Sequence, residues 1–502
     1  MNYLVGENVF TFNSGTEFSQ FERLNAFNKV GMTTKLITKN YNRFATRDMK
    51  DHGIDSKMVI NMYDYFQGVS DIPIKKQNLR YLSSMPLDYY HIVGIDNNST
   101  NINLDGKTKG TINVMPGTVG LVGDIDYKDS LGQSAVRKYF DWRGFCSMVE
   151  TYHPNGEIAH QSYLNSDGIP VIEIVFMYIN EEVRPTMWKL LNYMGKDYQF
   201  DTENQLFTFF LNEVNIHEPG NFISDRRSLD SVVLNIRNPK STCAYLHSSP
   251  FTNPKHPKKS DILSAYNVAL GLDKNINIRF DKVICPTEEQ TDDLKDICED
   301  VKFDFAPDSY VETTNKVKHI EKDIVLVYVG RLSEEKNISD LVKCFSFLDK
   351  KRDNLNLILQ GYFSSQSYEN KIKKLISDLK IESKVEFKVY NPNLNSTYEH
   401  ATMFINTSIS EGFGMNMLES MSYGVPVASF SNLYSKNNLI KNEVNGVWTK
   451  NRSALILANK IDEILNDPDS YRALSSGAIK TADVFSEKHF IELWKNLMYR
   501  KA

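Results

Sequence analysis

Two glutamates flank a glycine-rich turn in the C-terminal part of the chain, an arrangement that suits a ligand carrying hydroxyls beside a phosphate. Glu411 lies in the turn, and Glu419 lies about one turn into the helix expected after it. Gly412 and Gly414 would let a ligand approach the backbone, and the helix presents unpaired N–H groups that attract an anion. The surrounding sequence predicts a strand over 403–408, a turn at 411–414, a helix over 415–423 and a strand after Pro426. Ligands of open α/β sheets bind beyond the carboxyl ends of such strands.

Two cations follow another expected strand. Arg331 and Lys336 lie five residues apart in a loop, after the apolar run at 323–329 and before a helix. The arginine could bind a diphosphate through two hydrogen bonds and the lysine could act as a point charge, which together would neutralise a diphosphate leaving group without a metal. A basic pair on the surface is the commonest meaning of this spacing, so the motif needs support from its surroundings.

His247 and Gly15 are further candidates. His247 follows an expected strand at 242–246, at the carboxyl end where ligands bind, although a lone histidine is more often structural. Gly15 follows a turn at Asn13 and Ser14 and begins an expected helix, so a diphosphate could lie against its backbone. A plain turn is the ordinary alternative for a single glycine.

The elements that would position these residues form two α/β halves. A strand at 3–6, an amphipathic helix and a strand at 34–38 open the first half, and the apolar strand at 323–329 opens the second. Between about 66 and 210, short β-rich segments alternate with the turns Pro154-Asn155-Gly156 and Ser166-Asp167-Gly168, which indicates antiparallel hairpins. The edges of such a sheet must pair or bind something, so the insertion is a candidate for acceptor binding or oligomerisation, with a passive structural role as the alternative.

The expected fold is therefore α/β, with two Rossmann-like domains facing a cleft and an antiparallel β-meander inserted in the first. The expected boundaries are 1–65 and 211–317 for the N-terminal Rossmann-like domain, 66–210 for the inserted sheet, 318–485 for the C-terminal domain and 486–502 for a helix that crosses back.

Composition excludes several classes of protein. The chain has 502 residues, with 58 basic and 63 acidic side chains, so net charge gives no push toward nucleic acid. The five cysteines are scattered without a C-x-x-C pair, which fits a reducing cytoplasm better than a disulfide framework. No signal peptide and no run of 18 apolar residues occurs, so we expect a cytoplasmic protein, or one that is peripheral at the inner face of the membrane.

Three motifs carry a resemblance to a known family. The sequence E-G-F-G-x-x-x-x-E followed by S-Y-G-V-P-V resembles the Glu-x7-Glu signature of retaining, nucleotide-sugar-dependent glycosyltransferases of the GT-B type. The loop G-R-L-x-x-E-K-N is similar to their diphosphate-binding loop. The opening N-x-x-x-F-x-S-G-T-E-x-x-Q-x-x-R, from Asn8 to Arg23, is similar to the bacterial enzymes that glycosylate serine-rich and serine-aspartate-repeat adhesins.

The resemblance implies a role for each candidate. Glu419 would accept hydrogen bonds from the ribose, Glu411 would bind the donor sugar, and the N–H groups of Phe413, Gly414 and Met415 would hold sugar or phosphate oxygens. His247 matches by location the histidine near the reacting carbon. The departing phosphate would take the proton of the incoming hydroxyl on the same face, so no protein base is required.

The resemblance also implies the substrates. The enzyme would transfer N-acetylglucosamine from UDP-N-acetylglucosamine (UDP-GlcNAc) to serine hydroxyls of an acidic repeat protein. A basic groove for that acceptor could be lined by the residues near the His247 strand, namely Arg226, Arg227, Lys255, Lys258 and Lys259, although a solvated charged face is the more usual meaning. No metal is expected: Asp124-Ile125-Asp126 is a D-x-D, but it lies in the expected meander without a Rossmann strand before it.

Two other functions stay open. The chain resembles equally in layout the wall-teichoic-acid α-N-acetylglucosaminyltransferases, which use the same donor and a polyol-phosphate acceptor. It could also be a non-catalytic acceptor-binding subunit of a glycosyltransferase pair, whose donor motifs are typically degraded. A homo-oligomer, or a partner subunit bound through the inserted sheet, would fit either case.

Overall fold

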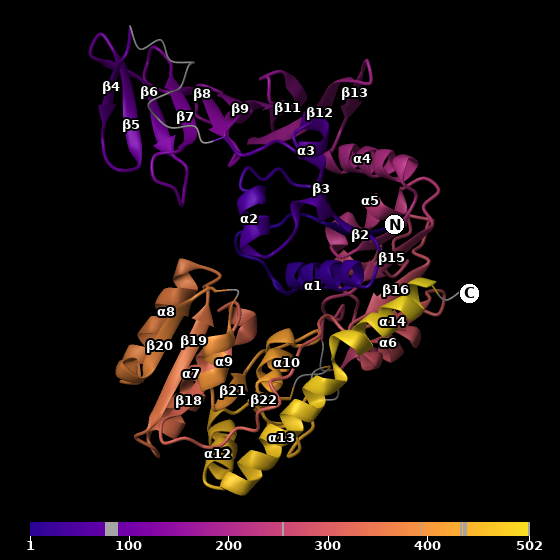
Figure 1. Cartoon of the computed structure of the whole chain (residues 1–502), viewed down its shortest axis with the longest axis vertical. Helices are drawn as coiled ribbons and strands as arrows, with labels where there is room; N and C mark the ends of the chain where they lie inside the picture. Colours follow the sequence, from indigo (N-terminus) through magenta and orange to yellow (C-terminus); the bar gives the residue numbers. More distant parts are fainter. Residues whose placement is uncertain (76–88, 254–255, 392, 432–433, 435–438, 500–502) are drawn as a thin grey trace. The chain divides into compact units, whose positions relative to one another are not determined.

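The computed structural model of the chain describes residues 1–75, 89–253, 256–391, 393–431, 434 and 439–499. These residues form two compact units (Figure 1). Unit 1 comprises Met1–Thr11, Thr33–Phe222 and Ser231–Lys240, and unit 2 comprises Phe12–Met32, Ile223–Asp230 and Ser241–Ala502. Each unit is described by itself.

Unit 1 is dominated by an antiparallel sheet. Within the described residues it has ten strands, each paired with the next along the chain, so the sheet is a meander. The strands are β4 (His91–Gly94), β5 (Ser99–Leu104), β6 (Lys107–Val114), β7 (Val122–Lys128), β8 (Ser134–Phe140), β9 (Cys146–Tyr152), β10 (Ile158–Leu164), β11 (Pro170–Ile179), β12 (Glu182–Tyr193) and β13 (Lys196–Phe200). Gly156 and Gly168 close two hairpins with φ of 85° and 82°, a conformation that suits glycine. The inserted antiparallel meander predicted from the hairpin signals is confirmed.

Three helices of unit 1 accompany this sheet: α2 (Ala45–Asp51), α3 (Met62–Gln67) and α4 (Glu203–His217). Helix α3 packs against β10 and β11, and α4 packs against β13. The first parallel strands, β1 (Asn2–Gly6), β2 (Thr34–Thr38) and β3 (Val59–Asn61), also belong to unit 1. Their mutual pairing is parallel throughout.

Unit 2 has parallel strands of its own, in the order β17-β16-β15. The later strands are β14 (Asn221–Ser224), β15 (Ser241–Tyr245), β16 (Lys282–Cys285) and β17 (Phe303–Phe305), with the helices α1 (Gly15–Lys29), α5 (Asp230–Leu234) and α6 (Glu288–Lys295) in the connections. Thr287 accepts a hydrogen bond from the N–H of Gln290 and so caps the start of α6.

A second parallel sheet lies within unit 2. Its order over the described residues is β20-β19-β18-β21-β22-β23, the order 3-2-1-4-5-6 of a Rossmann fold. The strands are β18 (Ile324–Val329), β19 (Leu355–Gly361), β20 (Val385–Val389), β21 (Met403–Asn406), β22 (Val427–Phe430) and β23 (Gly446–Thr449). The helices are α7 (Ile338–Asp349), α8 (Gln366–Asp378), α9 (Asn395–His400), α10 (Met415–Ser422), α12 (Ala454–Leu465), α13 (Pro468–Val484) and α14 (Glu487–Tyr499).

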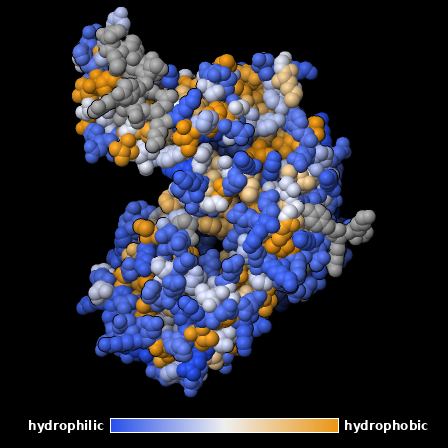
Figure 2. Space-filling view, in the orientation of Figure 1, coloured by the Kyte–Doolittle hydropathy of each residue, from blue (hydrophilic) through white to orange (hydrophobic). Residues whose placement is uncertain are grey.

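The core of this second sheet explains why its strands read as continuous apolar runs. Five of the six residues of β18 are buried, as expected for a parallel strand covered on both faces. Helix α7 packs on β19 while α10 packs on β21 and β22. Outside this core the visible surface of the region is largely hydrophilic with scattered apolar side chains (Figure 2).

The last helix packs against α1 and β15 inside unit 2. Trp494 of α14 is buried and contacts the rings of Phe27 and Tyr245. Residues 500–502 of the predicted closing helix lie outside the described residues. No helix in the described part of the chain is long and apolar enough to cross a membrane.

Candidate functional site

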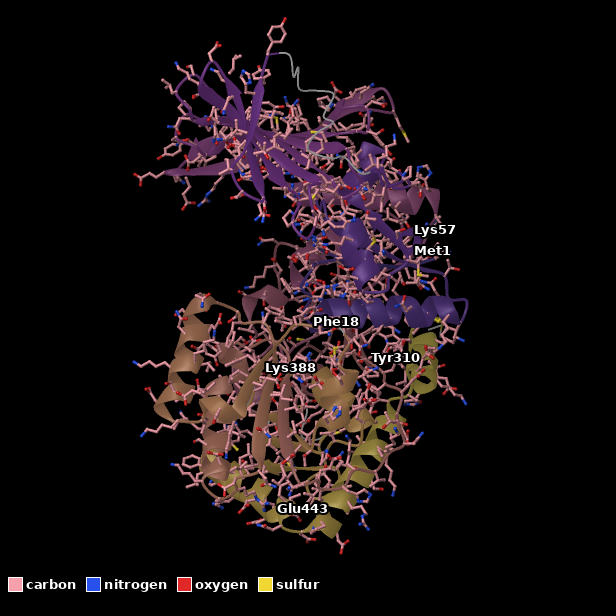
Figure 3. All side chains as sticks on the ribbon, turned by 60° about the vertical axis from the view of Figure 1, so that its left-hand side comes forward. Met1, Phe18, Lys57, Tyr310, Lys388 and Glu443 are labelled. Atoms are coloured by element: carbon pink, nitrogen blue, oxygen red, sulfur yellow. The ribbon has the colours of Figure 1, made fainter. Side chains whose placement is uncertain are left out.

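The candidate site lies in unit 2, where the strand order of the second sheet reverses. Strand β18 pairs with β19 on one side and with β21 on the other, so the loops after β18 and β21 leave the same edge side by side. Figure 3 labels Lys388 close to the end of β20 and so marks this carboxyl edge. Ligands of open α/β sheets bind at such a switch point.

Lys336 and Glu411 meet here although 75 residues separate them. The Lys336 Nζ lies 2.9 Å from both Oε1 and Oε2 of Glu411. The Glu411 side chain is only 9% exposed and that of Lys336 20%, so the pair is largely shielded from water. The N–H of Ile409 donates to the main-chain oxygen of Glu335, which ties the two loops together.

Arg331 is placed differently from Lys336. Its Nη2 lies 2.5 Å from Oε1 of Glu335, and both side chains are about half exposed, at 43% and 55%. An exposed ion pair of this kind contributes roughly 0–1 kcal/mol, so an incoming anion can displace the glutamate at small cost. The loop thus holds one shielded cation, Lys336, and one half-exposed cation, Arg331, whose ion pair is weak.

The glycine-rich turn is shaped by close contacts. Gly414 begins α10 with a φ of 100°, and a Cβ there would overlap the Met417 side chain. A Cβ on Gly412 would overlap the main-chain oxygen of His247, so the turn lies directly against the end of β15. Phe413 is buried and packs on Phe485. The turn is therefore fixed by neighbours on both sides.

Two predicted residues from distant parts of the chain lie against this turn. The His247 main chain contacts Gly412, and a Cβ on Gly15 would lie 3.7 Å from the Met415 sulfur, an ordinary contact. Gly15 begins α1 behind Ser14, whose N–H donates to Glu17 at 2.9 Å. The structure thus brings Gly15, His247, Gly412 and Met415 together within unit 2.

Both ring nitrogens of His247 are occupied by carboxylates. Nδ1 lies 2.8 Å from Oδ1 of Asp308, and Nε2 lies 2.9 Å from Oδ1 of Asp225. Burial works to lower the pKa of His247, but the two carboxylates, Asp308 first, outweigh it and raise that pKa above its usual value. His247 lies at the end of β15, as predicted, and its main chain contacts the glycine-rich turn. Its ring points into a cluster of charged side chains.

Glu419 lies one turn into α10, as predicted. Its Oε2 accepts a hydrogen bond of 3.1 Å from the Tyr398 hydroxyl. Burial raises the pKa of Glu419 to about 7, with the Tyr398 hydrogen bond working in the opposite direction. A carboxyl group whose pKa lies near neutral pH, at the edge of the sheet where ligands bind, is a candidate for ligand binding.

Sequence reasoning missed several charged residues of the site. Asp225, Asp308 and Arg23 take part in the cluster around His247, and Glu22 of α1 has a pKa raised to about 8, mainly by burial and also by Glu419 among other groups. One signal was available: the opening motif already contains Gln20 and Arg23, three apart on one face of a helix.

The predicted basic groove is only partly described. Arg226 binds Glu17 and Ser14, while Arg227 donates to the main-chain oxygens of Ser224 and Tyr245 and pairs with Asp230. These two guanidinium groups are therefore engaged within unit 2. Lys259 is exposed, Lys255 lies outside the described residues, and the side chain of Lys258 is not described. The groove stays a prediction.

The aspartates of the D-x-D are held in ion pairs on the meander. Asp124 pairs with Arg137 at 2.7 Å and Asp126 pairs with Lys128 at 2.6 Å. Among the residues that the structure describes, no three His, Cys, Asp or Glu side chains gather as metal ligands would.

Comparison with known proteins shows what the fold and the C-terminal part of the chain are similar to. Residues 311–481, which contain both cations and the whole glycine-rich turn, match the family Glycosyl transferases group 1. The structure of Staphylococcus aureus TarM, a G117R mutant in complex with fondaparinux, alpha-GlcNAc-glycerol and UDP, aligns with a TM-score of 0.82 over 99% of both chains at 19% identity. The chain has the GT-B fold, with a group 1 glycosyltransferase domain over residues 311–481.

The chain also has curated relatives. It is 22% identical over 503 residues to the Streptococcus pneumoniae UDP-N-acetylglucosamine–peptide N-acetylglucosaminyltransferase GtfA subunit, covering 96% of this chain and 95% of that one. It is 25% identical over 379 residues to the Bacillus subtilis poly(glycerol-phosphate) alpha-glucosyltransferase, a match that covers 74% of this chain but spans only 55% of that protein. The fold and the enzyme class predicted from the sequence are confirmed.

Proposed function

We propose that this glycosyltransferase transfers N-acetylglucosamine from UDP-GlcNAc to serine hydroxyls of a serine-rich or serine-aspartate-repeat protein, with retention of configuration. The single observation that carries the proposal is the meeting of Lys336 with Glu411 at the switch point of the second sheet, beside the turn that begins α10. The full-length match to a peptide N-acetylglucosaminyltransferase subunit supports this acceptor class.

Each side chain has a role in gripping the donor. Lys336 and Arg331 neutralise the diphosphate, the arginine after leaving the exposed Glu335. The N–H groups of Phe413, Gly414 and Met415 hold sugar or phosphate oxygens at the start of α10. Glu419 accepts the ribose hydroxyls, and Glu411 binds the donor sugar while it keeps Lys336 in place between turnovers.

The chemistry then needs charge stabilisation more than a base. As the bond to the anomeric carbon breaks, negative charge grows on the diphosphate, which the two cations are placed to accept. The departing oxygen takes the proton of the serine hydroxyl on the same face of the sugar. The side chains of Lys336, Arg331, Glu411 and Glu419 provide orientation and electrostatics, and this scheme requires no metal.

The inserted sheet is our candidate for acceptor or partner binding. One face of it carries a ladder of hydrogen-bonding side chains from neighbouring strands: Asn113 and Arg137 donate to Asp124, while Tyr139, Tyr152 and Gln161 donate to Glu150. Directly opposed residues of antiparallel strands share a face, so these groups lie on one polar face of the sheet, where the carboxylates of Asp124 and Glu150 are themselves buried. Such a surface suits an extended hydrogen-bonding chain or a second subunit.

The proposal is tested with radiolabelled UDP-GlcNAc and two acceptors. We expect label in a serine-aspartate repeat peptide and none in a polyol-phosphate polymer. Label in the polymer alone would establish the alternative, a teichoic-acid glycosyltransferase, which the likeness to TarM favours. Absence of both transfer and donor hydrolysis would indicate a non-catalytic subunit. Competition between UDP-glucose and UDP-GlcNAc in the same assay tests which sugar the enzyme transfers.

The pH dependence of donor capture follows from Glu419. Its two oxygens both accept hydrogen bonds from ribose hydroxyls, and more strongly, when the carboxyl group is ionised, and its pKa is raised to about 7. We expect kcat/KM for the donor to fall as pH decreases below about 7, by up to tenfold per pH unit. Because the pKa of Glu419 is higher in the folded state, the folded protein binds the carboxyl proton more tightly than the unfolded chain does. The stability that this proton contributes therefore declines as pH rises from the pKa of Glu419 in the unfolded chain to about 7.

The matched variants are Glu419→Gln and Glu463→Gln. Glu419→Gln should have a lower kcat/KM that no longer depends on pH in this range. Glu463, exposed on α12, should leave the profile unchanged when replaced. A wild-type profile that is flat between pH 5.5 and pH 8 would rule out ribose binding by an ionised Glu419.

A further inference from the structure

Four charged side chains from separate elements form a buried alternating row beside the donor turn. Arg23 of α1 pairs with Asp225 at 2.8 Å, Asp225 with His247 at 2.9 Å, and His247 with Asp308 at 2.8 Å. The side chains of Arg23 and Asp225 have no exposed surface, and those of His247 and Asp308 are 10% and 5% exposed. We call this row the ionic quartet.

Helix α1 and helix α14 hold the quartet rigidly. Gln20 donates to the second oxygen of Asp225 at 2.9 Å, and the Ser19 hydroxyl donates to the main-chain oxygen of Asp308 at 2.7 Å. The Arg23 guanidinium lies over the neighbouring rings of Tyr245 and Trp494, 4.6 and 4.7 Å from their centroids. Both carboxylate oxygens of Asp225 and both ring nitrogens of His247 are thus engaged, while Nε and Nη1 of Arg23 have no hydrogen-bond partner among the described residues.

The quartet fixes the chemical state of His247. A neutral imidazole has one donor nitrogen and one acceptor, but both carboxylates here are acceptors, so only the imidazolium can make both hydrogen bonds. Asp225 supports this: burial works to raise its pKa, yet Arg23 and His247 outweigh burial and lower it to about 2. The ring is thus a cation with both nitrogens engaged, and it is placed neither to accept a proton nor to donate to a sugar.

What His247 does offer the donor site is its main chain. Its carbonyl oxygen lies against Gly412 so closely that a Cβ could not fit between them. Because the ring is held at both nitrogens, it anchors the His247 main chain against the turn between Glu411 and Gly414, and release of the ring would let this main chain shift. A displacement of the turn by about 1 Å is enough to reduce turnover roughly a hundredfold.

We infer that Asp308 and Asp225 are positioning residues of the donor site, which lock His247 as an imidazolium so that its main chain sets the place of the Gly412 turn. The inference rests on the proposed function, because it assigns the turn to the donor sugar. Arg23 belongs to the same device, since it orients Asp225. The quartet is neutral overall, with two cations and two carboxylates, which is how four charges can be buried together.

A double-mutant cycle tests the coupling. Asp308→Asn keeps the shape of the side chain but removes its charge, and His247→Ala removes the ring. We expect each to lower kcat for UDP-GlcNAc turnover roughly ten- to a hundredfold, with KM for the donor changed less than about threefold. The double variant should be no slower than the slower single variant, because Asp308 acts through His247.

Three controls make the outcome decisive. Asp462 lies on α12 and pairs with Lys351 and Arg352. The Asp462→Asn variant removes this carboxylate and should keep the wild-type kcat. Thermal unfolding midpoints show whether each variant folds. If Asp308→Asn does not fold, Ser19→Ala is the milder variant and should lower kcat several-fold in the same direction. A wild-type kcat in the folded Asp308→Asn variant, or losses that multiply in the double variant, would overturn the inference.

A measurement without substrate separates this inference from the proposed function. In protein labelled with 15N-histidine, the His247 signals are assigned by their loss in His247→Gln. We expect both ring nitrogens to stay protonated at pH 8 in the wild type, and one to lose its proton in Asp308→Asn. A neutral ring in the wild type at pH 8 would refute the locked imidazolium even if sugar transfer is found. A wild-type protein that turns over no donor would instead refute the proposed function.

Discussion

Replacing Lys336 with alanine is expected to lower kcat for sugar transfer by roughly a hundred- to a thousandfold while the fold is retained. Lys336 is the shielded cation of the site, 2.9 Å from both carboxylate oxygens of Glu411. Without it, Arg331 is the remaining cation, and the charge that grows on the leaving diphosphate faces the uncompensated carboxylate of Glu411, which is only 9% exposed. Repulsion then adds to the loss of attraction.

The measurement is single-turnover transfer from UDP-GlcNAc, with unfolding midpoints for the fold. Lys343→Ala is the matched control, because Lys343 is an exposed lysine on α7 whose partner is Asp340. Arg331→Ala should also lose activity, although its exposed position predicts a larger part of that loss in donor affinity. Normal turnover by Lys336→Ala would remove the diphosphate assignment.

Gly412→Ala is the second substitution with a large expected effect. The added methyl group would occupy the place of the His247 main-chain oxygen, and backbone atoms cannot yield as a flexible side chain can. The turn must therefore shift away from β15, and a shift of about 1 Å at residues that grip the sugar costs roughly a hundredfold in rate. The φ angle of Gly412 is not positive, so alanine can adopt the backbone conformation there and the expected effect comes from the steric clash.

Gly94→Ala is the control for this substitution. Gly94 lies at the end of β4 with nothing near its Cβ position, so alanine there should leave both activity and stability unchanged. Gly15→Ala provides a graded comparison, because its Cβ would make only an ordinary contact with Met415. If Gly412→Ala turns over donor at the wild-type rate, the close packing of the turn has no bearing on catalysis.

Local patterns were enough to predict most of the architecture. The apolar run before Gly330 became β18, the turn from Glu411 to Gly414 leads into α10, and the hairpin signals around Gly156 and Gly168 became antiparallel strands. These features depend on neighbours within a few residues, where period, capping and turn chemistry act. Element ends moved by one or two residues, since terminal turns depend on packing.

Local sequence patterns predict a parallel sheet with two cations after one strand and two glutamates around the next turn, because these are properties of short segments. Packing of whole elements brings Lys336 to Glu411, pairs Arg226 and Arg227 with groups inside unit 2, and encloses the ring of His247 between Asp225 and Asp308. Apart from the contacts of Arg227 with residues three positions away, these pairings join residues from 18 to 212 positions apart. No periodicity records such distances, since they are set by how whole strands and helices pack.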